Sequence, residues 1–206
     1  MTAIKICGIT REQDLLDAAR AGANAVGFVF YTKSPRAVTP ARAAELMRGL
    51  PPFVTSVGLF VDAGVDEVKA ALAVARVDLL QFHGDETPAY CRQFNIPYLK
   101  ALRVRPGVDL LQYAREYHGA RGLLLDAFVE GTPGGTGATF DWALIPKNLP
   151  LPVVLSGGLT PGNVAASIRV VRPWAVDVSS GVEISKGIKS AEKIAAFVTG
   201  VRNADV

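Results

Sequence analysis

The segment AIKICGITREQDLLDAARAGANAVGFVF (residues 3–30) sets a pattern that the rest of the chain repeats. Residues 3–7 and 24–30 are short apolar, β-branched runs, which are typical of strands. Between them, leucines and alanines recur on one face of a predicted helix, with Thr10 as the expected N-cap and Gly22 as the expected stop. A strand, a helix and a second strand in this order predict a βαβ unit with parallel strands.

The same alternation continues along the chain. Two further helices are predicted to start at Thr39 and Thr160, each capped by the threonine and followed by a proline at the first helical position. The predicted strands cover residues 3–7, 24–30, 54–60, 78–82, 97–103, 121–126, 152–156 and 174–178, and the predicted helices cover 10–23, 39–50, 64–75, 87–94, 108–118, 140–146, 161–170 and 190–199. Eight such units predict an α/β protein with a (β/α)₈ TIM barrel, and an open doubly wound sheet is the competing architecture.

Composition narrows the classes of function. Half of the 206 residues are hydrophobic and a fifth are charged, and no linker divides the sequence, so residues 1–206 are predicted to form a single domain. The 22 basic and 19 acidic residues are intermixed, which argues against a nucleic-acid surface. No apolar run approaches 18 residues, so no membrane span is predicted and a cytoplasmic protein is expected. Two cysteines and two histidines, widely scattered, predict free thiols and no metal site.

In a parallel barrel, catalytic side chains lie at the carboxyl ends of the strands. Cys7 ends the first predicted strand, His83 follows the fourth, Arg103 ends the fifth and Asp126 ends the sixth. Lys5 shares the alternation phase of Cys7, so it is expected to point into the barrel and to need a carboxylate partner, for which Asp177 is one candidate. These positions are where the sequence predicts an active site.

Two loops predict a phosphate site. LSGGLTPGN (155–163) follows the seventh strand and DVSSGVE (177–183) contains the end of the eighth. Small residues there let backbone N–H groups converge on an anion, and in barrels these two loops are the recurring phosphate-binding position. Gly157, Gly158, Ser180 and Gly181 are therefore the predicted phosphate-binding residues, although glycines also serve simply to make tight turns.

Cys7 and Asp126 also have plainer explanations. A free cysteine is often a small buried hydrophobe, and a carboxylate after a strand often caps a helix. At this edge of a barrel, however, a thiol can accept a proton and a carboxylic acid beside an apolar wall can donate one. Arg36 suits a planar carboxylate, whereas His83 alone is more commonly structural.

The motifs together resemble the phosphoribosylanthranilate isomerase family. KICGIT (5–10), AVGFVFYTKSPR (25–36), VGLFVD (57–62), QFHG (81–84), LLLD (123–126), GGTG (134–137), the glycine loop from residue 156 and AVDVSSGVE (175–183) occur in the family's order. The resemblance spans nearly the whole chain. One departure is Lys186 to Ser190 (KGIKS), where the family commonly has Pro-Gly-x-Lys-Asp; serine caps a helix about as well as aspartate.

The resemblance implies an Amadori rearrangement in tryptophan biosynthesis, with no cofactor and no metal. The small phosphorylated substrate would be N-(5-phospho-β-D-ribosyl)anthranilate. By that resemblance Asp126 is the general acid that opens the sugar ring, Cys7 is the general base that removes the C2 proton, and Arg36 binds the substrate carboxylate. His83 and Gly135 are expected near the substrate, and the glycine loop that contains Gly135 is expected to close over it.

Several alternatives remain open at this point. Other phosphate-binding barrel enzymes, such as tryptophan synthase α or indole-glycerol-phosphate synthase, share the glycine loops, and a catalytically silent metabolite-binding protein would keep them too. Activity on the aminoaldose of histidine biosynthesis is a further possibility. The chain is expected to be a monomer or a homodimer.

Overall fold

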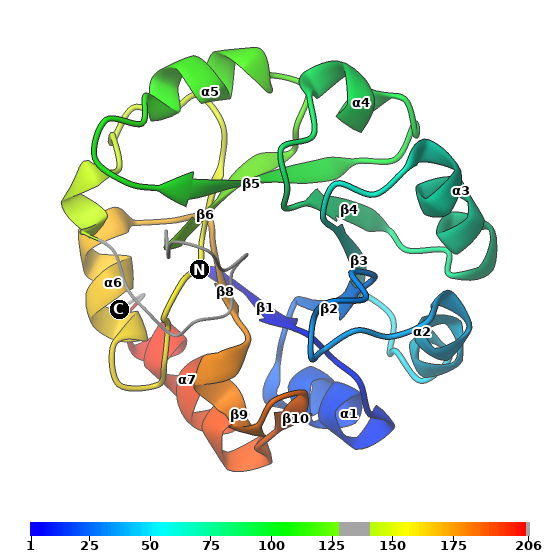
Figure 1. The fold of residues 1–206 in the computed structure, drawn as a ribbon. Coiled ribbons are helices and arrows are strands. Elements are labelled where there is room, and N and C mark those ends of the chain that lie inside the picture. The colour runs from blue at the N-terminus through cyan, green and yellow to red at the C-terminus, as the bar shows by residue number, and fades with distance from the viewer. Residues whose placement is uncertain (128–140, 205–206) are drawn as a thin grey trace.

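The computed structural model describes residues 1–127 and 141–204, and in it eight parallel strands close into a barrel surrounded by helices (Figure 1). Each strand pairs with the next, and β1 also pairs with β8, which closes the ring. The strands are β1 (Ala3–Cys7), β2 (Ala25–Val29), β3 (Thr55–Phe60), β4 (Leu79–Phe82), β5 (Tyr98–Val104), β6 (Gly122–Ala127), β7 (Val153–Leu155) and β8 (Ala175–Val178). The predicted TIM barrel is thus confirmed, and the open sheet is wrong.

The helices form an outer ring because each buries one apolar side against the strands. They are α1 (Glu12–Ala21), α2 (Pro40–Met47), α3 (Val65–Val74), α4 (Pro88–Arg92), α5 (Leu110–Glu116), α6 (Val164–Val171) and α7 (Ala191–Ala204). Between β6 and β7 the described residues contain only the short 3₁₀ turn η1 (Trp142–Leu144), where a helix was predicted over 140–146. Seven α-helices are therefore described where eight helices were expected.

The main core lies between the strands and the helices. Ile6 and Phe28, on the outward side of their strands, have no exposed surface and pack with the inner residues of the helices, such as Leu15 and Phe197. A second, smaller cluster of buried apolar side chains comes from β5 to β8: Leu99, Ala101, Leu124, Val154 and Ala175. Burial on both sides of the sheet explains why the strands are nearly continuous apolar runs.

A hairpin follows the eighth strand and was not predicted. After the 3₁₀ turn η2 (Ser180–Val182), the strands β9 (Glu183–Ser185) and β10 (Ile188–Lys189) pair antiparallel before α7 (Figure 1). Ser190 caps α7 as expected, because its Oγ accepts a hydrogen bond from the Lys193 N–H at 3.2 Å. The hairpin buries Lys189, whose ammonium group donates a hydrogen bond to Glu183.

Two predicted helix starts are wrong, and one is confirmed. The N-cap of α1 is Arg11, not Thr10, whose hydroxyl instead donates to the Gly187 carbonyl at 2.6 Å. At α2, Thr39 accepts a hydrogen bond from the Arg42 N–H as predicted. The helix predicted from Pro161 begins three residues later, because residues 161–163 form a turn and Asn163 is the N-cap.

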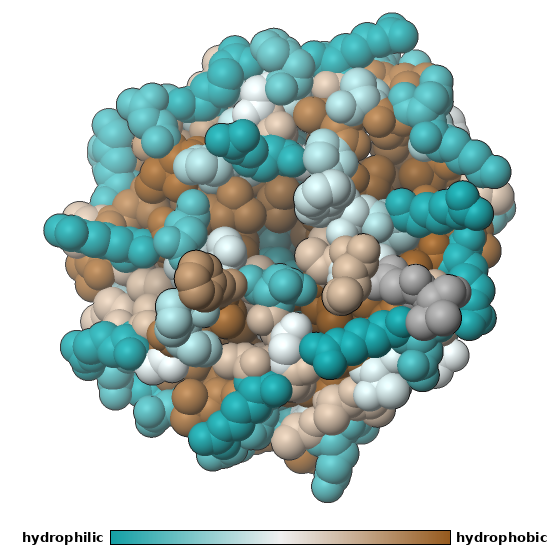
Figure 2. Space-filling model, turned by 180° about the vertical axis from the view of Figure 1, so that it is seen from behind, coloured by the Kyte–Doolittle hydropathy of each residue, from teal (hydrophilic) through white to brown (hydrophobic). Residues whose placement is uncertain are grey.

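The surface carries long hydrophilic side chains around its outline. Figure 2 shows them projecting around the face opposite that of Figure 1, with apolar side chains visible between them and toward the centre. Across residues 1–127 and 141–204, no helix combines the length and apolar character that a membrane crossing requires.

Candidate active site

A hollow opens at the carboxyl ends of the strands, where the sequence placed the candidate residues. Cys7, Arg36, His83 and Asp126 all line it, from the first, second, fourth and sixth β/α units. Gly157, Gly158 and Ser180 line it from the loops after β7 and β8. Residues that are up to 173 positions apart in the sequence therefore share one site because parallel strands end at one rim.

The Cys7 thiol sits in a tight space at the end of β1. Cys7 is 5% exposed and pairs in register with Gly27 on β2. A β-carbon at residue 27 would lie only 2.8 Å from the Cys7 Sγ, so glycine is needed there for the thiol to keep its position. Burial raises the pKa of the Cys7 thiol, and the positive charges of Lys5 and Lys189 oppose that shift.

Beneath the thiol, Lys5 and Asp177 form a buried ion pair. The Lys5 Nζ lies 2.8 Å from the Asp177 Oδ1, and both side chains are about 5% exposed. Burial alone would lower the pKa of Lys5, but the Asp177 carboxylate and the Cys7 side chain together outweigh it and raise that pKa. Asp177 also accepts a hydrogen bond from the Ser156 hydroxyl at 3.3 Å. The partner that strand alternation suggested for Lys5 is confirmed.

Asp126, at the end of β6, faces a histidine. The His83 Nε2 lies 3.1 Å from the Asp126 Oδ2, and the other ring nitrogen, Nδ1, lies 2.9 Å from the Gln81 Nε2. Asp126 is 4% exposed and Gln81 is fully buried. The Asp126 carboxyl group is thus in contact with the His83 ring, and Gln81 in turn contacts that ring. Bulk water has little access to the carboxyl group because it is buried.

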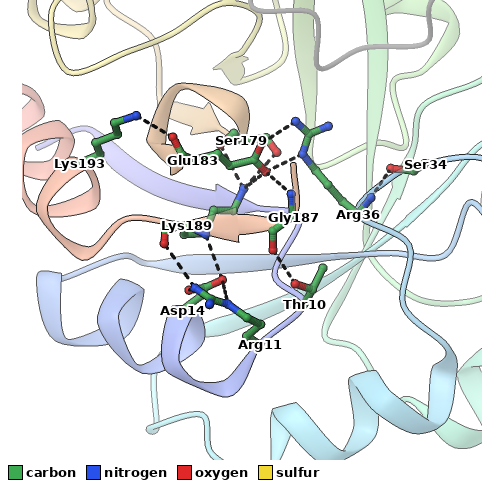
Figure 3. A network of polar contacts seen from close by, with 10 residues as sticks. All are labelled: Thr10, Arg11, Asp14, Ser34, Arg36, Ser179, Glu183, Gly187, Lys189 and Lys193. Atoms are coloured by element: carbon green, nitrogen blue, oxygen red, sulfur yellow. Dashed lines mark hydrogen bonds and ion pairs between the residues drawn. The ribbon is translucent and has the colours of Figure 1, made fainter. Parts of the chain in front are cut away.

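Arg36 is anchored by a carboxylate that no sequence pattern pointed to. Its Nε and Nη2 donate to Glu183 Oε1 and Oε2 at 2.7 and 2.8 Å (Figure 3). Lys189 donates to Glu183 Oε1 at 2.9 Å and to the carbonyl and hydroxyl of Ser179 at 3.1 and 3.2 Å. We refer to Arg36, Glu183 and Lys189 as the Arg36 cluster.

Charge does not balance within the Arg36 cluster. Two cations share one carboxylate, so the cluster carries one positive charge in excess when all three groups are ionised. Burial alone would raise the pKa of Glu183, but hydrogen bonds from Arg36 and Lys189 hold it below the ordinary value. Burial lowers the pKa of Lys189, and Glu183 opposes that shift. An anion entering the hollow beside Arg36 would meet this excess charge.

The loop after β7, which lines the hollow, has a backbone conformation that glycine adopts readily. Gly157 and Gly158 have φ angles of +84° and +64°, a left-handed conformation that residues with a β-carbon rarely adopt. Among residues 1–127 and 141–204, their N–H groups meet no acceptor. Asn163 fixes this loop, since its Nδ2 donates to the Gly158 carbonyl and its Oδ1 accepts from the Thr160 N–H.

The structure brings together most of the predicted residues. Gly181 does not line the hollow and instead packs tightly against the backbone of residue 159. Gly135 and its glycine loop lie outside the described residues. Arg103, at the end of β5, lines a neighbouring hollow with Tyr113.

Sequence analysis missed Gln81, Glu183 and Lys189. Glu183 lies at the end of the quoted DVSSGVE motif, but its partner Arg36 is 147 residues away. Gln81 could have been noticed, because it is a polar residue between Leu80 and Phe82 in a predicted strand whose other polar residue, Asp78, is at its start.

Comparison with known proteins shows which family this chain belongs to. Residues 4–200 match the family of N-(5'phosphoribosyl)anthranilate (PRA) isomerases. The N-(5'-phosphoribosyl)anthranilate isomerase of Nitrosospira multiformis is 61% identical over 198 residues, which cover 96% of this chain and 95% of that protein.

Solved structures of isomerases from this family superpose closely. The phosphoribosyl anthranilate isomerase of Thermotoga maritima has a TM-score of 0.91 and 39% identity, with 98% of this chain and 100% of that chain covered. A phosphoribosyl anthranilate isomerase in complex with reduced 1-(o-carboxyphenylamino)-1-deoxyribulose 5-phosphate has a TM-score of 0.88, 38% identity and the same coverage. Monomers generated from the dimeric T. maritima isomerase have a TM-score of 0.88 and 37% identity, again with that coverage.

Proposed function

The chain belongs to the N-(5'-phosphoribosyl)anthranilate isomerase family, and on that premise we propose which of its residues perform each chemical step. Its reaction is an aldose–ketose isomerisation in tryptophan biosynthesis. The sugar ring of N-(5-phospho-β-D-ribosyl)anthranilate opens, and an Amadori rearrangement gives 1-(2-carboxyphenylamino)-1-deoxy-D-ribulose 5-phosphate. Ring opening needs a proton donor, and the rearrangement needs a base at C2. The observation that carries the assignment is that one hollow is lined by both a carboxyl group and a thiol.

Asp126 is the general acid in this proposal. It donates a proton to the ring oxygen of the sugar, the C1–O bond breaks, and the nitrogen lone pair forms the C1=N bond of a Schiff base. Its low exposure, 4%, supports the role, because a shielded carboxyl group can deliver its proton without competition from bulk water.

Cys7 is the general base. As a thiolate it removes the C2 proton of the Schiff base, which gives an enolamine that tautomerises to the ketone. The raised pKa of the buried thiol makes the thiolate scarce in the empty site but a stronger base once it forms. The excess positive charge of the Arg36 cluster favours that thiolate.

Arg36 binds the anthranilate carboxylate, and the two glycine loops bind the phosphate. Glu183 engages the Nε and one Nη2 hydrogen of the guanidinium. A guanidinium has five N–H donors, so the remaining ones are available to a second carboxylate in the same plane. The N–H groups of Gly157, Gly158 and Ser180 supply donors for the phosphate oxygens, without the cost of burying a further charged side chain.

Fluorescence decay of phosphoribosylanthranilate generated in situ tests the two catalytic roles. We expect Cys7→Ala and Asp126→Asn each to lower kcat by about 10²–10⁴-fold, the usual contribution of a positioned acid or base. Cys91→Ala is the matched control, because Cys91 is a buried thiol whose pKa burial raises to about 12 and which does not line the hollow. If Cys7→Ala retains the activity of the control, Cys7 is not the base.

We propose two binding partners for this chain. The small phosphorylated substrate is one partner, and the chain itself in a homodimer is the other that we propose to test. Phe53 is fully exposed, so it presents an aromatic ring to solvent. Sedimentation velocity should show a dimer for the wild type and a monomer for Phe53→Ser if this ring lies at the contact; a wild-type monomer would exclude the homodimer.

A further inference from the structure

Gln81 is an unusual residue for its position. It lies on the inward side of β4, in register between Leu59 of β3 and Leu99 of β5, and it has no exposed surface. Within the described residues its Oε1 has no hydrogen-bond partner, although an amide in an apolar layer normally satisfies both ends. A leucine or methionine would fill this place with no unpaired polar atom of its own, so the amide requires an explanation.

The partner of the Gln81 amide is His83. The two residues are two positions apart on the strand and therefore face the same side, and the Gln81 Nε2 lies 2.9 Å from the His83 Nδ1. An amide nitrogen only donates, so Nδ1 must accept and carries no proton. The ring proton is then on Nε2, which lies 3.1 Å from the Asp126 Oδ2 and donates to it.

The opposite orientation of the amide is less favourable. It would direct Oε1 at Nδ1 and would therefore require a proton on Nδ1. It would also place the two amide N–H donors at the position where the single oxygen Oε1 now has no partner among the described residues. With Nδ1 protonated, the ring would either be an imidazolium or lose the Nε2 proton that it gives to Asp126. The amide orientation therefore decides the charge of the ring and the direction of its hydrogen bond.

We propose that Gln81 is a positioning residue that keeps His83 neutral and protonated on Nε2, so that Asp126 holds the catalytic proton. This inference rests on the proposed role of Asp126 as the general acid. The His83 N–H occupies one carboxyl oxygen, Oδ2, and the proton delivered to the sugar resides on the other. No group is oxidised or reduced, and the proton passes from Asp126 to the ring oxygen.

A neutral His83 ring favours the reaction both before and after Asp126 transfers its proton. An imidazolium next to Asp126 would favour loss of the carboxyl proton before the substrate arrives, and Asp126 would then have no proton to donate to the sugar. A neutral ring still donates a hydrogen bond, which stabilises the carboxylate that remains after transfer. A neutral donor therefore serves the step better than a charged one or no donor at all.

The test is ¹⁵N NMR of protein labelled in histidine, in a His118→Gln background so that His83 is the remaining imidazole. His118 is the other histidine of the chain and lies beyond the end of α5, outside the hollow. We expect one protonated nitrogen, Nε2, and one unprotonated nitrogen, Nδ1, near pH 7. A signal from an imidazolium, or from a ring protonated on Nδ1, would overturn the proposal directly, whatever the activity.

Two substitutions at residue 81 provide the kinetic part. Gln81→Glu places a carboxylate against Nδ1, and we expect an imidazolium spectrum together with a fall in kcat of about 100-fold. Gln81→Met is close in shape and removes the donor, and we expect mixed tautomers and a fall in kcat of about tenfold with KM nearly unchanged. Wild-type kcat in a Gln81→Glu variant whose ring has become an imidazolium would refute the proposal.

Failure of the acid assignment is a separate result. If Asp126→Asn retains activity, Asp126 is not the acid, and the proposed link from Gln81 to catalysis falls with it even when the His83 tautomer is as expected. If Asp126→Asn is inactive but Gln81→Glu is fully active, only the positioning role is wrong. Circular dichroism and thermal unfolding of the Gln81 variants exclude loss of the fold as the cause of a lower kcat.

Discussion

Removing the carboxylate of the buried Lys5–Asp177 pair should destabilise the protein in a way that depends on pH. In Asp177→Asn the Lys5 ammonium stays buried, about 5% exposed, with no counter-charge at 2.8 Å. Breaking one side of a buried ion pair typically costs about 3–5 kcal/mol. Since a domain is stable by only about 5–15 kcal/mol, this one change should consume a large part of the free energy of unfolding.

The cost of the unpaired charge depends on the proton equilibrium of Lys5. Instead of staying charged, the folded variant can release the Lys5 proton, and with an unfolded pKa of about 10.4 this costs about 4.6 kcal/mol at pH 7 and about 1.9 kcal/mol at pH 9. Release of the proton therefore limits what the unpaired charge itself can cost, and that part of the penalty should shrink as the pH rises.

In the wild type, Lys5 should not make stability depend on pH between pH 7 and pH 9, and its contribution should be lost only at higher pH. The pKa of Lys5 is raised in the folded protein, so its contribution to stability is fully present below the unfolded pKa and is lost as pH rises through the folded pKa. In Asp177→Asn the folded pKa falls below the unfolded one, the unfolded state binds more protons, and stability increases from pH 7 to pH 9.

Urea unfolding at pH 7, 8 and 9, followed by circular dichroism, gives the required free energies. The double variant Lys5→Met/Asp177→Asn is the matched control: it removes both charges, should recover most of the loss at pH 7, and should lack the pH slope. A single variant within about 0.5 kcal/mol of the wild type at pH 7 would refute the account of this pair.

Three other substitutions test single contacts. Gly27→Ala should displace the Cys7 thiol, whose Sγ would lie 2.8 Å from the new β-carbon, and should lower kcat on the order of 100-fold with the circular dichroism spectrum unchanged. Glu183→Gln should loosen Arg36 and raise KM about tenfold with a smaller change in kcat, as steady-state kinetics would show. The pKa of Glu183 is lowered in the folded protein, so its contribution to stability is present above the unfolded pKa of about 4.3 and is lost as pH falls through the folded pKa. The Tm measured toward pH 3 should therefore drop more for the wild type than for Glu183→Gln. Thr39→Ala should cost about 1 kcal/mol in urea unfolding through loss of the α2 cap, with kcat unaffected.

The fold and the position of the site could be predicted from sequence because both depend on local patterns. A strand and a helix differ in the period of their apolar residues, and each of the eight strands was found within a few residues. Parallel pairing then places Cys7, His83 and Asp126 at one rim. Strand alternation alone was enough to direct Lys5 inward and to suggest Asp177 as its partner.

What only the tertiary structure decided was which polar groups meet. Glu183 and Arg36 are 147 residues apart, and their pairing depends on how the hairpin of β9 and β10 folds back over the rim, which no local period encodes. The start of α6 moved from Pro161 to Val164 because Asn163 bonds to the loop before it, a contact that outweighs the local preference for proline at a helix start. Local propensity involves neighbours along the chain, whereas ion pairs and hydrogen bonds involve whatever the closed barrel brings within about 3 Å. The sequence therefore determined the strands and the residues at their ends, and the closed barrel determined the partners that set their charge and direction.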